Sequence, residues 1–568
     1  MTPPSAAIDG ALVPAPRRIL AALTLFAFLP FAFAELFWDD FLVIRPDGPI
    51  ASLSTLTIAF FGRCVLFSEE YVYPYYRPMI DSLFVLEYAV AGTHPFLYHL
   101  TNFLLHLANT LLLFGLLRRF LAERPAGEAC AFLGTALFAF HPIQVESVLW
   151  PAARPAVLCT FFLLAGIRAA LSSIEGKTAG GVWGGGAGAL ALFVASLLSK
   201  EISIAAPPCL ALLLLAAPAR RARVVVLLAC SMVILATYLV MNAAIGSSAG
   251  GLSTKGPLGL AEPVARMLGF YGYQYLMPLS LYPNYAPQVT QGALPLLGGI
   301  ALLLGGAAIM IWALLKRTFF AASMFAAAVF LLGGAALPLL GGQVKAADRY
   351  VYQALIGLAF LGASAAARFP SWMTRVPPRV IVLGVPLLLA GLSLRQSAVW
   401  LNGDSVWSWT VEKDPTNLIG NYYLGMSHEQ NGNLDAAIEA FKAAAFETPE
   451  ETELFRFYGA MSYGRLNMFA GNFAEARRGL ALAMEHPRVA PSATVWMAIT
   501  ALREGDKKRA REWVDRFQDT GRERGETYEN LARLEHALGG DAAKVQAWIQ
   551  RAAERGRTVD PASFTSGE

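Results

Sequence analysis

The chain has 568 residues, of which 56% are hydrophobic and 15% charged, and its mean hydropathy is +0.48. Soluble proteins carry about 25% charged residues, so a wholly soluble globular enzyme is excluded. The formal net charge of +4 is small for this length and is dispersed along the chain, which argues against a nucleic-acid partner.

Charged residues are distributed unevenly along the chain. Residues 397–568 contain 45 of the 86 charged side chains, which is about a quarter of that segment, against about a tenth of residues 1–396. This contrast predicts a membrane domain over 1–396, a linker over 397–413 and a soluble domain over 414–568. The five cysteines lack paired spacing and histidine companions, so they indicate neither a disulfide framework nor a zinc site.

Long apolar runs predict an all-α, polytopic membrane domain, because every backbone amide inside a bilayer must be hydrogen-bonded within its own helix. The segment 263–280 is aromatic and contains Gly269 and Gly272, so we expect a re-entrant or interfacial helix there instead of a full crossing. Eleven other runs qualify as spans: 19–36, 96–117, 129–140 with the loop that follows, 154–172, 181–198, 202–218, 224–244, 291–314, 318–340, 350–367 and 378–395.

Basic clusters predict the orientation of these spans. With a cytoplasmic N-terminus, every even-numbered span should end in lysines and arginines, as the positive-inside rule requires. The clusters are Arg118 and Arg119; Arg168 and Lys177; Arg220, Arg221 and Arg223; Lys316 and Arg317; and Arg368, Arg375 and Arg379. An odd number of spans then delivers the C-terminal domain to the outer face. The Ala-, Gly- and Arg-rich composition favours a bacterial inner membrane, with that face in the periplasm.

Ionisable residues at the outer ends of the spans are the candidate functional groups, since charges at membrane depth are costly and mark sites or pathways. Carboxylates surrounded by cations suit a reaction in which a base deprotonates a hydroxyl while a phosphate leaves. The structural alternative is that these cations only anchor the topology. Between Gly48 and Cys64, spaced apolar residues predict an amphipathic segment on the outer leaflet. The outer candidates are Asp39, Asp40, Arg77, His141, Glu146, Arg154, Lys200, Glu201, Asp348, Arg349 and Tyr350.

The C-terminal domain contains a repeat. From Leu418 the sequence fits one 34-residue tetratricopeptide (TPR) unit, with matching residues at Leu424, Gly425, Ala437, Phe441, Ala444 and Pro449. The Gly-Asn pair at 432–433 recurs at 471–472, and Gly-Asp pairs follow at 505–506 and 540–541. Three or four helical hairpins are therefore expected, in a short solenoid that offers a surface for a polypeptide partner; a passive scaffold is the alternative.

The order of these motifs resembles the transmembrane and tetratricopeptide-repeat O-mannosyltransferases. These belong to the C-type (GT-C) glycosyltransferases, multi-span enzymes that use polyprenyl-phosphate sugars. The likeness extends in order over nearly the whole chain, although the repeat array is short, Asp348 stands where the family usually has Glu, and Pro155 replaces a small residue. The motifs are Trp38-Asp39-Asp40, Tyr76-Arg77-Pro78-Met79, His99-Leu100-Thr101-Asn102 with Leu105-His106, His141-Pro142 with Glu146 and Arg154, Lys200-Glu201, and Asp348-Arg349-Tyr350-Val351-Tyr352.

The resemblance implies roles for these residues in an inverting sugar transfer to a Ser or Thr hydroxyl of a protein. Asp39 would be the general base, Asp40 would support it, and Glu146 would hold the acceptor or a sugar hydroxyl. No cofactor is required, although the three carboxylates could hold a divalent cation. Contacts to the donor phosphate and substrate would come from Arg77, His141, Arg154, Lys200, Glu201, Asp348, Arg349 and Tyr350.

Two other functions stay open. A non-catalytic, membrane-anchored TPR scaffold for envelope assembly would retain the same loops as structural elements. An O-antigen ligase or polymerase is also multi-span, but such enzymes place their chemistry in one large late outer loop. The late outer loop here, 341–350, is short, which disfavours that class.

Overall fold

The computed structural model describes residues 12–564 except 47, 62–75, 206, 208–219, 246–255, 317–322, 324–329, 333–345, 369–377, 449–453, 522 and 561–563. The residues in these ranges form helices and connecting loops, without a strand, which confirms the predicted all-α class. Contacts divide the chain into two units, Met1–Val406 and Trp407–Glu568. The division falls inside helix α19 (Gly403–Lys413), within the segment predicted as a linker.

Within the described residues, six helices of the first unit are long and apolar enough to cross a membrane, as expected of an integral membrane protein. Each coincides with a predicted run. Runs 202–218 and 318–340 lie largely outside the described residues, so eleven spans and their orientation stay predictions. The six are Pro16–Phe33 (α2, Pro16–Phe28, with η1, Leu29–Phe33), Pro95–Phe120 (α6), Pro151–Glu175 (η4, Pro151–Ala153, with α9, Arg154–Glu175), Ala179–Leu197 (α10), Arg221–Asn242 (in α12, Arg221–Ile245) and Arg379–Val399 (in α18, Pro378–Val399).

A seventh candidate span is bent. Helix α7 (Gly127–Phe140) continues into η3 (Pro142–Gln144) and α8 (Val145–Leu149) with a bend of 48°. The break follows from the sequence, because Pro142 cannot continue the hydrogen bonding of α7 and the His141 side chain accepts a hydrogen bond from the backbone N–H of Ile143 at 3.3 Å. The bend brings Glu146 into a short helix of its own.

The other described elements of the first unit include α14 and α16, which overlap the predicted runs 291–314 and 350–367. The candidate site lies on α3, η5 and η8 and on the turn formed by α8 and η4. The elements are α3 (Asp40–Val43), η2 (Pro49–Ala51), α4 (Thr55–Phe61), α5 (Pro78–Ala91), η5 (Glu201–Ala205), α13 (Gly256–Leu276), η7 (Pro287–Thr290), α14 (Ala293–Lys316), η8 (Asp348–Tyr350) and α16 (Ala354–Arg368).

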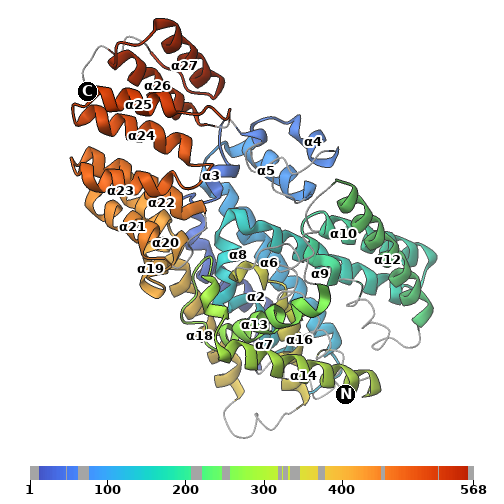
Figure 1. Cartoon of the computed structure of the whole chain (residues 1–568). Coiled ribbons are helices and arrows are strands. Elements are labelled where there is room, and N and C mark those ends of the chain that lie inside the picture. Colours follow the sequence, from blue (N-terminus) through green and yellow to red (C-terminus); the bar gives the residue numbers. More distant parts are fainter. Residues whose placement is uncertain are drawn as a thin grey trace. The chain divides into compact units, whose positions relative to one another are not determined.

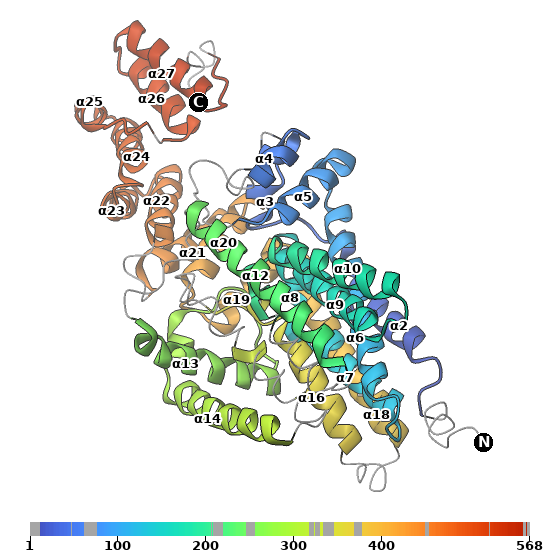
Figure 2. The same ribbon diagram turned by 90° about the vertical axis from the view of Figure 1, so that its right-hand side faces the viewer.

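The aromatic segment predicted as a re-entrant or interfacial helix forms α13, which packs beside α14 (Figure 2). Gly269 does not interrupt this helix. A Cβ at Gly269 would overlap the backbone oxygen of Pro295, and a Cβ at Gly299 would overlap the backbone oxygen of Ala265. The glycines therefore permit two helices to approach closely.

The second unit is a row of helical hairpins, drawn in orange to red in Figure 1. The unit begins within α19, and its described residues then form four hairpins, within the predicted three or four. The hairpins are α20 (Leu418–Gln430) with α21 (Leu434–Phe446), α22 (Leu454–Phe469) with α23 (Phe473–Ala483), α24 (Ala490–Arg503) with α25 (Lys507–Arg516), and α26 (Gly525–Ala537) with α27 (Ala542–Glu554).

Glycine turns and glycine crossings define these hairpins. Gly432, Gly471 and Gly505 have φ values of 77°, 80° and 85°, which L side chains rarely adopt. In the fourth hairpin the residue with positive φ is Gly539, one position before the Gly-Asp pair at 540–541 that the repeat pattern predicts. Between the helices of the first hairpin, a Cβ on Gly425 would lie 2.7 Å from the Phe441 ring, so the small residue is needed for close crossing.

Candidate active site

The adjacent carboxylates Asp39 and Asp40 lie in different surroundings. Asp40 is fully buried, and its two oxygens accept hydrogen bonds from the backbone N–H groups of Phe37, at 3.3 Å, and Ala152, at 3.0 Å. Burial raises the pKa of Asp40 well above its usual value, although the two backbone donors oppose the rise. Asp40 therefore joins the start of α3 to the η4 turn and has both oxygens occupied.

Asp39 keeps its carboxylate available. It is partly buried, and its side chain makes no hydrogen bond or ion pair with any residue that the structure describes. Burial raises the pKa of Asp39 to about 6, while the nearby positive charge of Arg349 opposes the rise. A carboxyl with a pKa near neutrality that is not occupied by the protein suits general-base catalysis.

Arg349 is held in place by Glu146. Its Nη1 lies 2.5 Å from Oε1 of Glu146, and its backbone N–H donates to Oε2 of the same residue at 3.1 Å. The guanidinium also lies over the rings of Tyr350 and Trp150, with Cζ 4.9 and 5.2 Å from their centroids. The Glu146 side chain is 1% exposed and that of Arg349 is 20% exposed, so the arginine reaches solvent and its partner does not. The prediction that Glu146 holds a sugar hydroxyl stays a prediction; in this structure both its oxygens bind Arg349.

A second ion pair lies beside Lys200. Arg77 donates from Nε and Nη2 to the carboxylate of Glu201, with distances of 3.2 and 2.7 Å to its two oxygens. The neighbouring Lys200 is buried, with Nζ 5.7 Å from the centroid of the Tyr350 ring. Its ammonium makes no hydrogen bond or ion pair with the described residues. Burial lowers the pKa of Lys200 to about 8, and repulsion from Arg77 contributes.

Asp348 precedes Arg349 and is held by a hydrogen bond. Tyr285 donates its hydroxyl hydrogen to Oδ1 of Asp348 at 2.9 Å. Burial raises the pKa of Asp348 well above its usual value, and the negative charge of Glu146 adds to the rise. Asp348 is thus held at the start of η8 and positions the Arg349 that follows it.

Two predicted substrate contacts are occupied elsewhere by protein groups. Arg154 has no exposed surface; it donates to Oδ1 of Asn102 at 2.6 Å and to the backbone oxygen of Tyr98 at 2.8 Å, and it forms an ion pair with Glu87. The Nε2 of His141 lies 3.1 Å from the backbone oxygen of Tyr275. The structure therefore brings together Asp39, Glu146, Lys200, Arg349 and Tyr350, with Arg77 and Glu201 beside them, but leaves Arg154 and His141 outside this group.

Sequence reasoning missed Glu87 and Tyr285. Glu87 lies in α5, and an acidic residue within the apolar segment 78–91 was the available signal for a buried partner of an arginine. Tyr285 had no such signal, because nothing in the local sequence relates it to Asp348, 63 positions away.

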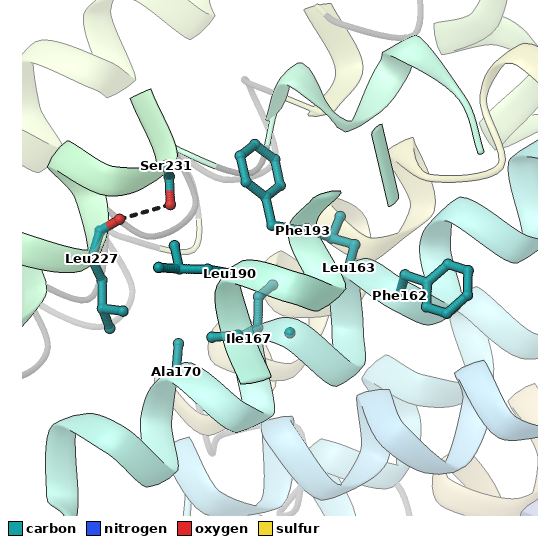
Figure 3. Close-up of a pocket in the computed structure, with 10 residues that line it drawn as sticks. Phe162, Leu163, Ile167, Ala170, Leu190, Phe193, Leu227 and Ser231 are labelled. Carbon is teal, nitrogen blue, oxygen red and sulfur yellow. Dashed lines mark hydrogen bonds between the residues drawn. The ribbon is translucent and has the colours of Figure 1, made fainter. Parts of the chain in front are cut away.

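The described residues offer no metal site but include an apolar crevice. No group of three His, Cys, Asp or Glu side chains is arranged to hold a metal ion there. An apolar crevice lies among α9, α10 and α12, lined by Phe162, Leu163, Gly166, Ile167, Ala170, Ala189, Leu190, Phe193, Leu227 and Ser231 (Figure 3). The Ser231 hydroxyl donates to the backbone oxygen of Leu227, so the crevice offers packing surface and no reactive group.

Comparison with known proteins gives one consistent relationship. The chain is 30% identical over 148 residues to the protein O-mannosyl-transferase TMTC2 of Mus musculus, which is 26% of this chain and 17% of that protein. It is 32% identical over 123 residues to TMTC1 of Homo sapiens, covering 22% and 13%, and 30% identical over 193 residues to Tmtc1 of Drosophila melanogaster, covering 33% and 21%. No family model and no solved structure matches the chain.

The matched segments span about a fifth or less of the length of these relatives. The matches confirm the resemblance that the motif order predicts: over a quarter to a third of its length, the chain is similar to the TMTC protein O-mannosyl-transferases.

Proposed function

We propose that this chain is a membrane glycosyltransferase that moves a sugar from a polyprenyl-phosphate donor to a Ser or Thr hydroxyl of a protein, and that the sugar is mannose. One observation carries the proposal. Within the cluster that the structure describes, Arg349 and Arg77 are paired with carboxylates, whereas the carboxylate of Asp39 and the ammonium of Lys200 are not. Arg349 is close enough to influence the pKa of both.

This arrangement provides one base and one cation for a substrate. The hydroxyl oxygen of the acceptor attacks the anomeric carbon, its proton passes to Asp39, and the bond from the anomeric carbon to the phosphate oxygen breaks. The electron pair leaves with the polyprenyl phosphate, and Lys200 and the exposed part of Arg349 neutralise the charge that develops. Attack opposite the leaving phosphate inverts the configuration at the anomeric carbon.

The similarity to these relatives supports the sugar and the acceptor class, since each is called a protein O-mannosyl-transferase. We further propose that the active face is the outer one, periplasmic in a bacterium, and that no metal or other cofactor takes part. The apolar runs around the site suit a donor with an isoprenoid tail, whose transfer from lipid into water would be costly.

The solenoid is proposed to recruit the acceptor polypeptide. Arginines and aromatic rings alternate along α22 and α24: the Arg465 guanidinium lies over Trp496, Trp496 contacts Phe469, and Arg503 lies 4.7 Å from the centroid of the Phe469 ring. Phe469 is 49% exposed, so this group presents apolar and cationic surface together. Repeat stacks commonly bind extended polypeptides on such surfaces.

Transfer by the purified chain tests the proposal. The full-length protein in lipid nanodiscs is given polyprenyl-phosphate mannose and a Ser/Thr-rich peptide, and mannosylated peptide is measured by mass spectrometry. We expect transfer by the wild type and its loss in Lys200→Met, with the exposed Lys442→Met as the matched control. Transfer from a different polyprenyl-phosphate sugar would correct only the sugar. No transfer from any such donor would overturn the assignment and favour the scaffold function.

A further inference from the structure

The residue before the candidate base has an unusual backbone conformation. Trp38 has a φ of 56°, in the left-handed region that bulky L residues rarely adopt. Its ring stacks on Trp150, with centroids 4.4 Å apart and planes 5° apart. Such conformations persist where the surrounding structure holds them, and they cluster at ligand sites.

The stack lies in the candidate active site. Asp39 follows Trp38 directly, and the Cζ of Arg349 is 5.7 Å from the centroid of the Trp38 ring and 5.2 Å from that of Trp150. Trp150 is 2% exposed, whereas Trp38 is partly exposed. The buried Trp150 ring therefore supports the Trp38 ring, which reaches the surface. The candidate base Asp39 and the guanidinium of Arg349 lie beside this stack.

A polar group under the stack lacks a partner. The indole Nε1 of Trp150 is buried and makes no hydrogen bond to any residue the structure describes. Buried indole N–H groups normally find an acceptor. The ring beneath Trp38 is therefore held with an unsatisfied donor, which ordinary core packing avoids.

We propose that the Trp38–Trp150 pair is a sugar-binding platform, on which the pyranose ring of the donor lies with its apolar C–H face toward Trp38. The C–H bonds of a pyranose are electropositive and the face of an indole ring is electronegative, so the two attract each other. The ring would be held beside Asp39, and Arg349 would meet the hydroxyl or phosphate groups at its edge. This inference rests on the proposed function and adds the residue that recognises the sugar, distinct from Lys200, which recognises the phosphate.

A comparison of two ligands separates these roles. Binding of polyprenyl-phosphate mannose and of sugar-free polyprenyl phosphate to the full-length protein in nanodiscs is measured by native mass spectrometry. We test Trp38→Gly, which accepts positive φ without strain, and Trp38→Phe, which retains a smaller ring. Trp183→Phe is the matched control, because Trp183 is 74% exposed on α10.

We expect Trp38→Gly to weaken binding of the mannosyl donor about tenfold and to leave binding of the sugar-free phosphate unchanged, with Trp38→Phe intermediate. Lys200→Met should weaken both ligands. Equal binding of both ligands by Trp38→Gly and wild type, or equal weakening of both, would overturn the platform while leaving the glycosyltransferase assignment standing. A wild type that binds neither ligand would overturn both.

Discussion

Replacing Asp39 by Asn should abolish transfer and stabilise the protein. A carboxyl whose pKa is raised on folding from 3.8 to about 6 is held in its ionised form at a cost of about 3 kcal/mol at neutral pH. Between these two pKa values the native state binds more protons than the unfolded state, so stability falls as the pH rises through that window. Asn carries no charge, and this cost disappears with it.

The neighbouring carboxyl supplies the control. Asp40→Asn removes the same group one position along the chain, but the amide NH₂ cannot accept a hydrogen bond from Phe37 or Ala152. A buried N–H left without an acceptor costs about 1–3 kcal/mol. Asp40→Asn also removes a carboxyl whose pKa burial raises, so the lost hydrogen bond opposes that gain. We therefore expect Asp40→Asn to be less stable than Asp39→Asn, although both variants reduce transfer.

Two measurements on one preparation decide the matter. Thermal unfolding in detergent at pH 7.5 gives the order of stability, and initial rates with polyprenyl-phosphate mannose give the loss of activity, which for a general base is about 10²–10⁴-fold. The reasoning is refuted if Asp39→Asn transfers mannose at the wild-type rate, because the base must then be another group. A lower melting temperature for Asp39→Asn would show that the carboxylate is paired in solution.

Three further predictions follow from the paired and unpaired charges. The pH profile of kcat/KM should be bell-shaped, rising with a pKa near 6 as Asp39 ionises and falling with a pKa near 8 as Lys200 loses its proton. Lys200→Arg should shift the alkaline limb of this profile to higher pH, and an unchanged limb would contradict the role of Lys200. Glu146→Gln should raise the KM for the donor about tenfold, because Arg349 loses a charge-assisted partner. The KM is measured by kinetics at varied donor concentration, and an unchanged KM would show that Glu146 only fills space. Arg154→Met should destabilise the fold by about 3–5 kcal/mol by leaving Glu87 buried and unpaired, and the double variant with Glu87→Met should recover most of that loss in thermal unfolding.

Sequence reasoning succeeded where the information is local. Apolar runs of about 20 residues predict spans because the constraint acts within one helix. In the described part of the chain, the six helices long enough to cross a membrane coincide with predicted runs. The recurring Gly-Asn and Gly-Asp pairs predicted three or four hairpins, and the positive-φ glycine of a turn differs from the predicted position only in the fourth hairpin, where it is Gly539 and a second glycine follows. Both features depend on neighbours within a few dozen positions.

The partners of the charged residues could not be predicted in this way. Arg77 pairs with a residue 124 positions away, Arg349 with one 203 positions away and Arg154 with one 67 positions away. The loops predicted to lie on the outer face contain several arginines that the sequence alone cannot distinguish, so each is a candidate for binding a phosphate. Which of them already has a carboxylate is fixed by the packing of α5, α8 and η5, and the packing is a property of the whole unit.

Pairing also explains how so polar a cluster can exist beside apolar helices. Burying an unpaired charge away from water costs free energy, and burying an ion pair with no net charge costs less. Two arginines are therefore compensated by Glu201 and Glu146. Within the described part of the cluster, the side chains of Asp39 and Lys200 have neither an ion pair nor a hydrogen bond, and burial raises the pKa of the first and lowers that of the second. A substrate that brings a phosphate to Lys200 and a hydroxyl to Asp39 relieves both at once. The two charged side chains of the described cluster that lack both an ion pair and a hydrogen bond are thus the two that a phosphate-linked donor and a hydroxyl acceptor would complete.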